Sequence, residues 1–203
     1  MAGSDVSAVI VSDEVALDAD GISVATSVGN NAALVIGGAL ADGGSVTNAS
    51  GRQVTILSAG NDSSKSFTIV GTDVNGATLT EALTGANAGT ATSSGYFKTI
   101  ASITAVGNPA GNVSAGINAN AADVIFAGRT RLKGFSFVSG GTAGKANIRN
   151  GSVTGTEVVQ FRSIGTDDSS EDPFIPDEGL LFKDGCFVTF VVPQFDLMMF
   201  YHA

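Results

Sequence analysis

The chain has 203 residues, of which 43% are hydrophobic, and this allows one large or two small domains with a buried core. Its formal net charge is -9 and its first basic residue is Arg52, which argues against nucleic-acid binding because neutralising phosphates needs clustered lysine and arginine. No apolar run approaches the roughly 20 residues of a membrane span, and the N-terminus lacks the basic and apolar regions of a signal peptide, so we expect folding in a cytoplasm and no membrane partner.

The composition favours an all-β fold. Glycine occurs 27 times and proline only four times, and small polar residues are abundant, which suits many short strands joined by tight turns. Ten of the twelve phenylalanines follow residue 125, so we expect two cores of different residue composition. The predicted architecture is an N-terminal extended arm followed by two β-sandwich modules.

Residues 1–30 are predicted to form the acidic arm. They contain two short alternating runs, 6–11 and 22–26, on either side of an acidic segment, and they have no aromatic anchor. An extended arm that pairs with a neighbouring chain and a sheet edge within the same domain both fit this pattern. The candidate docking residues of the arm are Asp13, Glu14, Asp18 and Asp20.

Residues 31–118 are predicted to form an immunoglobulin-like β-sandwich. The clearest signal is a hairpin in which the turn from Asp73 to Gly76 joins two runs with apolar residues at alternate positions. The last two turn residues, asparagine and glycine, tolerate the positive φ that a tight turn needs. A strand signal at 54–57 precedes the hairpin, and the run 96–104 follows it with apolar groups on both faces, as in a covered strand.

Residues 122–203 are predicted to form a second, jelly-roll-like β-sandwich. The small polar segment 118–121 is the predicted linker, because the composition changes beside it. Glycine-containing turns, among them Asn150-Gly151, separate the strand signals of this module. Those signals lie at 124–126, 131–138, 145–149, 157–164, 180–182, 186–192 and 195–201.

No residue constellation for catalysis, for a cofactor or for a metal is recognisable, so we do not expect an enzyme. His202 is the single histidine and lies beside the C-terminal residue, where fraying positions a general base poorly. Cys186 is the single cysteine, and its apolar surroundings predict a buried structural thiol. The acidic residues between 167 and 178 lack the spacing of a calcium-binding loop and are predicted to form a solvated connection.

A basic stripe is one further candidate for partner contacts. Arg129, Arg131 and Lys133 alternate, so on a strand they would share one face, with Leu132 and Gly134 on the other. The stripe could receive the acidic arm of a neighbouring subunit, although solvated charges on an outer strand explain the same pattern.

The C-terminal run from Phe195 to Tyr201 is another candidate. Its residues are typical of a core, but the length of the run without polar alternation also permits an intersubunit surface. The residues predicted to hold such an oligomer together are Phe195, Met198 and Phe200.

Two stretches carry a family resemblance. The first runs from Arg52 to Ile117 and includes RQVTILSAGNDSSKSFTIVGTDVNGATLTEALTGANAGTATSSGYFKTIASITAVG; the second comprises GFSFVSGGTAGKANIRNGS, FIPDEGLLFKDGCFVTF and MMFY. Together they cover about three quarters of the chain, without its first 50 residues. The pattern resembles structural proteins of tailed bacteriophages, especially marine and cyanobacterial ones. The resemblance implies a β-rich, non-enzymatic building block that assembles in many copies.

From this resemblance we expect a virion protein on the capsid surface, synthesised in the host cytoplasm, that decorates or cements the capsid lattice. The expected partners are the major capsid protein and further copies of the chain, as a homotrimer or another small homo-oligomer. A tail, adaptor or fibre component is the alternative within the virion. A carbohydrate-binding host-adhesion module is the alternative of another class, although the absence of tryptophan and the presence of only two tyrosines argue against sugar stacking.

Overall fold

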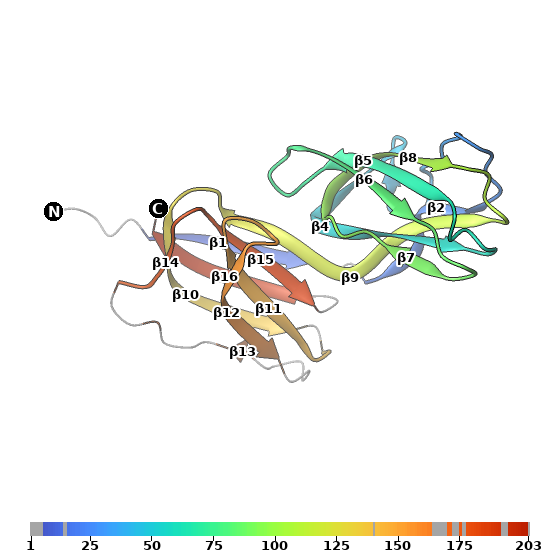
Figure 1. The fold of residues 1–203 in the computed structure, drawn as a ribbon. Helices are drawn as coiled ribbons and strands as arrows, with labels where there is room; N and C mark the ends of the chain where they lie inside the picture. The colour runs from blue at the N-terminus through green and yellow to red at the C-terminus, as the bar shows by residue number, and fades with distance from the viewer. Residues whose placement is uncertain are drawn as a thin grey trace. The chain divides into compact units, whose positions relative to one another are not determined.

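The computed structural model describes residues 6–13, 16–139, 141–163, 170–171, 175, 178–191 and 195–202, and within these ranges it contains sixteen β-strands and no helix. The prediction of an all-β fold is therefore confirmed. The chain divides into two compact units, Ala16–Ala119 and the combination of Met1–Val15 with Asn120–Ala203. Each unit consists of paired strands (Figure 1). Each unit also has its own apolar core.

The unit formed by residues 16–119 is built around four strands in the order β4-β8-β5-β6, and β4 also lies beside β9. Phe67, Phe97 and Ile103 are fully buried in its core, and burying each such side chain stabilises the fold by about 1.5–3 kcal/mol. Its strands are β2 (Asp18–Thr26), β3 (Ala41–Asp42), β4 (Ser45–Ser58), β5 (Ser66–Thr72), β6 (Thr78–Thr84), β7 (Thr90–Thr92), β8 (Phe97–Val106) and the first half of β9 (Val113–Phe126).

The predicted hairpin is present as β5 and β6, which pair antiparallel from Ser66↔Thr84 to Thr72↔Thr78. In the turn, the Asp73 carboxylate accepts hydrogen bonds from the backbone N–H groups of Asn75 and Ala77 at 2.8 and 2.9 Å. The positive φ of this turn falls on Gly76, at 80°. The run 96–104, predicted as a covered strand, forms most of β8. Both edges of β8 are paired, with β5 and with β4, and most of its side chains are buried or half-buried.

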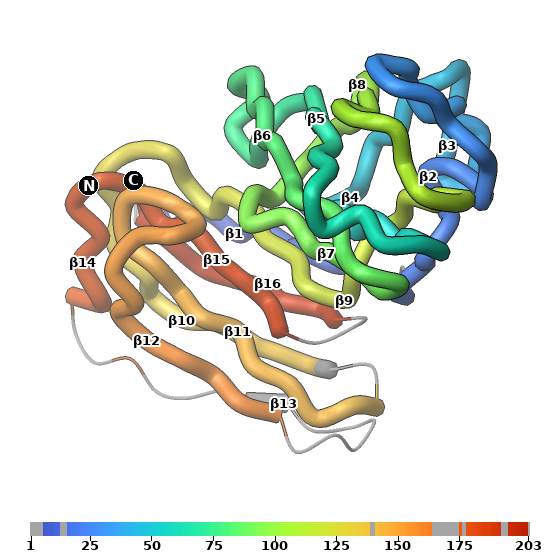
Figure 2. Tube along the Cα trace, turned by 45° about the vertical axis from the view of Figure 1, so that its right-hand side comes forward, coloured from blue at the N-terminus to red at the C-terminus, as the bar shows by residue number. Residues whose placement is uncertain are grey.

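The second unit contains two sheets. One has the order β1-β16-β10-β13, with β14 also paired to β10, and the other joins β12, β11, β15 and the second half of β9. The two orange strands of the β11–β12 hairpin run side by side in Figure 2. The strands of this unit are β1 (Val6–Asp13), β10 (Thr130–Ser139), β11 (Gly144–Asn150), β12 (Thr156–Ser163), β13 (Ser170–Glu171), β14 (Leu180–Phe182), β15 (Cys186–Val191) and β16 (Phe195–His202).

The described residues of the predicted arm form two strands that pair within the chain. β1 pairs with β16 from Val6↔His202 to Asp13↔Phe195, whereas β2 pairs with β9. The reason is apolar alternation: Val11 is buried and Val9 is half-buried against the same core. The described residues among the first 30 thus differ from an extended arm, because each of their two strands gains burial and backbone hydrogen bonds in its own unit.

The transition between the units falls between residues 119 and 120, within the segment predicted as a linker. The backbone there is a continuous strand, because β9 spans Val113–Phe126 without a break. Ala121, at the end of the predicted linker, and the adjacent Ala122 are fully buried and pair with β15, so their small side chains serve close packing. Small residues suit both a linker and a closely packed strand, so composition alone does not distinguish the two.

Gly71 provides a test of the packing between β5 and β8. A Cβ atom added at Gly71 would collide with the backbone carbonyl of Thr99, whereas at Gly89 the nearest atoms lie 3.7 Å away. We expect Gly71→Ala to lower the free energy of unfolding by about 2–3 kcal/mol, as overpacking does. Gly89→Ala is the matched control and should change it by less than about 1 kcal/mol. Urea unfolding measures both, and equal stability of the two variants would contradict the packing described.

Candidate functional site

The candidate functional site in the described part of the chain is an exposed sheet face. Within the described ranges, no group of three or more His, Cys, Asp or Glu side chains could hold a metal ion. No helix in the same ranges is long and apolar enough to cross a membrane. The most distinctive exposed feature is the outer face of the β1–β16–β10 sheet, which is the side that points away from the core of that unit.

β16 is the middle strand of this face, and its side chains alternate strictly between core and solvent. Phe195, Leu197 and Met199 are buried, and Phe195 stacks on Phe190 of β15 with ring centroids 3.5 Å apart. Met198 and Phe200 point outward, and each is 37% exposed. Of the three residues predicted to hold an oligomer, Phe195 is therefore a core residue, because the period of two along a strand places it opposite the other two.

The exposed β16 residues continue sideways into β1. Ile10 lies opposite Met198 and is 68% exposed, while Val6 lies opposite His202 and is 45% exposed. We call Val6, Ile10, Met198 and Phe200 the outer apolar patch. Cross-strand neighbours on one face are close enough to form a contiguous surface, and such apolar surface marks sites of macromolecular contact.

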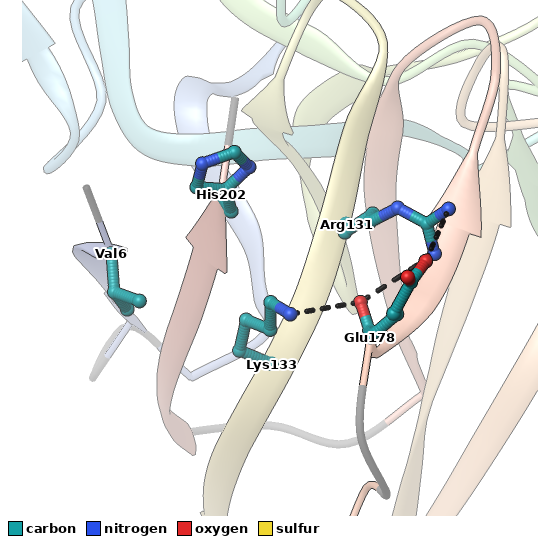
Figure 3. A pocket seen from close by; sticks show the side chains of 5 residues that line it. All are labelled: Val6, Arg131, Lys133, Glu178 and His202. Atoms are coloured by element: carbon teal, nitrogen blue, oxygen red, sulfur yellow. Dashed lines mark hydrogen bonds and ion pairs between the residues drawn. The ribbon is translucent and has the colours of Figure 1, made fainter. Parts of the chain in front are cut away.

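A pocket of about 380 Å³ opens at one end of this face, lined by Val6, Arg131, Lys133, Glu178 and His202 (Figure 3). Arg131 forms an ion pair with Glu178, with 3.2 Å between nitrogen and carboxylate oxygen. Lys133 donates to the backbone carbonyl of Glu178 at 2.9 Å. The Glu178 side chain is 82% exposed, so solvent screens the ion pair.

The predicted basic stripe differs from the structure in two respects. Arg129 is exposed but precedes the first residue of β10, so it is not part of the strand. The register of β10 against β16 shifts between Leu132 and Gly134, which makes Lys133 the extra residue of a β-bulge. Gly134 consequently lies opposite Phe200 on the outer face, although simple alternation places it with Leu132.

The described acidic docking candidates lie on two strands in different units. Asp13 ends β1, and its side chain and the whole of Glu14 lie outside the described residues. Asp18 and Asp20 belong to β2, where Asp20 is exposed and Asp18 is half-buried. The Asp18 carboxylate accepts a hydrogen bond from the backbone N–H of Asp20 at 3.2 Å, so it supports the local backbone as well as carrying charge.

Val6 and Ile10 also belong to this surface, but the sequence analysis did not identify them as candidates. Their alternation with Val9 and Val11 was visible, but it does not reveal which set faces the core. Asp196 is also exposed on the outer face. It lies near the start of β16, whereas His202 is the last residue of the same strand. Asp196 is the only charged residue in the sequence run 195–201, and this could have indicated which face of the strand meets solvent.

Comparison of the chain with family models, with curated proteins and with solved structures finds no match.

Cys186 tests how well the core of its unit excludes solvent. The thiol is buried, and this burial raises its pKa to about 12, so the nucleophilic thiolate is scarce at neutral pH. We expect the folded protein to resist a thiol-reactive dye at pH 8 and the unfolded chain, in guanidinium chloride, to incorporate one dye per molecule. Complete labelling of the folded protein within minutes would show that the site opens readily.

Proposed function

We propose that this protein is a structural component of a tailed-bacteriophage virion that decorates or cements the capsid lattice by binding the major capsid protein. The resemblance of residues 52–117 and of the C-terminal half to virion proteins supports the proposal. The supporting structural observation is the outer apolar patch on an all-β unit. A building block of this kind acts through contact surfaces, and many equivalent weak contacts on a lattice add up by avidity.

The docking surface in this proposal is acidic and includes Asp18 and Asp20. A net charge of -9 favours association with a basic surface, and charge complementarity mainly raises the association rate. Removal of residues 1–20 would be a poor test, because β1 pairs along its whole length with β16 and buries Val11. Such a deletion would disturb the fold and the docking surface together, so substitutions of exposed side chains are preferable.

Asp20→Lys tests this docking surface. Asp20 is exposed on β2, and reversal of its charge should weaken binding to capsids that lack this protein about fivefold, since an exposed charge pair contributes up to about 1 kcal/mol. Asp42→Lys, an equally exposed charge reversal in the same unit, is the control and should bind as the unmodified protein does. Co-sedimentation with capsids measures both. Equal binding of the two variants would exclude Asp20 from the docking surface.

The number of copies per virion tests the proposed function itself. Quantitative mass spectrometry of purified virions should find on the order of hundreds of copies, in a fixed ratio to the major capsid protein, because a decoration protein follows the symmetry of the lattice. A count of roughly 6–18 copies would instead support the tail, adaptor or fibre alternative, whose rings and fibres have closed symmetry. Absence from virions would overturn both assignments.

A further inference from the structure

We propose that Asn75, in the turn between β5 and β6, is a modification site at which the side-chain amide is lost by deamidation. The chain contains two Asn-Gly pairs, Asn75-Gly76 and Asn150-Gly151. Both have a sequence open to this reaction, because asparagine is chemically labile and glycine has no side chain to shield its backbone nitrogen. The fold leaves the first pair reactive and protects the second. This inference does not rest on capsid binding.

The reaction begins when the backbone nitrogen of Gly76 attacks Cγ, the side-chain carbonyl carbon of Asn75. A bond forms between these two atoms, and the backbone N–H proton goes to solvent. The bond from Cγ to the amide nitrogen breaks, and this nitrogen takes up a proton from water and leaves as ammonia. Water then opens the resulting succinimide ring at either carbonyl carbon, which gives aspartate or β-linked isoaspartate. The sum is hydrolysis of one amide, with water as the co-reactant.

Asn75 has a side chain that can turn toward the next residue. It is exposed, and none of the described residues forms a hydrogen bond with its side chain, since its bond to Asp73 uses the backbone N–H. A Cβ atom built at Gly76 meets none of the described chain within 4 Å, so the space around the nucleophile is open. The Gly76 N–H donates to the Asp73 carbonyl of the same turn at 3.1 Å. Local opening of one turn is therefore enough to free both reacting groups.

Asn150 is held on both sides of its amide by the loop before β15. Its Nδ2 donates to the Asp184 carboxylate at 2.9 Å, and its Oδ1 accepts from the backbone N–H of Asp184 at 3.2 Å. The nucleophile is held too, because the Gly151 N–H donates to the carbonyl of Gly185 at 3.0 Å. The Asp184 side chain also lies 3.6 Å from a Cβ built at Gly151. Reaction at Asn150 therefore requires two loops to separate.

The products also differ in how the fold accommodates them. A carboxylate at position 150 would face the Asp184 carboxylate that now accepts from Nδ2, and like charges this close repel. A carboxylate at the exposed position 75 meets solvent. Isoaspartate there adds one carbon to the backbone after the N–H of residue 75. The Asp73 carboxylate then no longer meets the N–H groups of residues 75 and 77 together, and the hairpin turn loosens.

The two hydrogen bonds of the Asn150 side chain set the expected difference in rate. Both must break before Cγ can approach the Gly151 nitrogen, whereas the Asn75 side chain has no such bonds to the described residues. Two bonds of this kind lower the population of the reactive conformer about tenfold. We therefore expect Asn75 to react about tenfold faster than Asn150 in the folded protein.

The test is peptide mapping by mass spectrometry of the folded full chain, incubated in mildly alkaline buffer for increasing times. Deamidated peptide should accumulate about tenfold faster at Asn75 than at Asn150. In guanidinium chloride neither pair keeps its contacts, and the two rates should agree within about twofold. Equal rates in the folded protein, a faster reaction at Asn150, or no reaction at Asn75 would overturn the proposal.

Asp184→Ala measures the contribution of the contacts around Asn150. It removes the carboxylate that accepts from Nδ2, so deamidation at Asn150 should accelerate about fivefold while the rate at Asn75 stays the same. Lys183→Ala changes the exposed neighbour of Asp184 in the same loop, and as the matched control it should alter neither rate. A rate at Asn150 that does not respond to Asp184→Ala would overturn this explanation of the protection.

Asn75→Gln provides a readout at the turn itself. The glutamine side chain is one carbon longer and closes the ring less readily, and the position is exposed, so the fold should persist while the reaction there is lost. Enzymatic methylation of isoaspartate should label the aged unmodified chain at position 75 and should label the aged variant far less. Equal labelling of the two would place the main modification elsewhere and overturn the assignment to Asn75. Absence of the protein from virions would leave all of these results unaffected.

Discussion

The unit that carries the candidate surface depends on β16 as the middle strand of its sheet. β16 pairs with β1 on one side and with β10 on the other, so both of its edges are hydrogen-bonded. This pairing holds Phe195, Leu197 and Met199 in the core, where Phe195 stacks on Phe190 of the facing sheet. The same alternation exposes Met198 and Phe200. The register of β16 therefore decides both which of its side chains are buried and which are exposed. A shift of one residue would exchange the two sets.

Carboxylates in the unit of residues 16–119 show why the net charge does not describe a docking surface. Glu81 accepts hydrogen bonds from the backbone N–H groups of Ser94 and Gly95, both at 2.8 Å. Asp62 is fully buried and accepts from the N–H of Ala110 at 2.7 Å. These acids fix loops between strands, as Asp73 does in its hairpin turn. Asp20 and Asp196, by contrast, are exposed, so a count of charges does not distinguish acids that hold loops from acids that face solvent.

The two Asn-Gly pairs show how tertiary contacts bear on the chemistry of one local motif. Each pair has its glycine at positive φ, 80° for Gly76 and 89° for Gly151. The turn at Asn75 is held by bonds within the hairpin, whereas the side chain of Asn150 is held by Asp184 of another loop. Opening of the first turn is local, while opening of the second separates two loops. The same dipeptide therefore has different surroundings, and these are the basis of the proposed difference in reactivity.

Local features were predictable from the sequence. The all-β composition, the alternation in 6–11 and 22–26 and the hairpin around Asp73 each depend on neighbours within a few residues. The exposed positions of Met198 and Phe200 were partly predictable, since the run 195–201 was identified as a strand that could serve a core or an interface. The residues that complete their surface, Val6 and Ile10, were not.

By itself, the sequence determined that the chain forms strands and where the hairpin around Asp73 turns, because local periodicity and turn chemistry decide these features. Only the tertiary structure decided that β1 pairs with β16 across almost the whole chain and that the bulge at Lys133 turns Gly134 outward. Both depend on contacts between residues distant in sequence. Alternation shows that a strand has two faces, but only the packed core decides which face meets solvent, and so which residues remain for a partner.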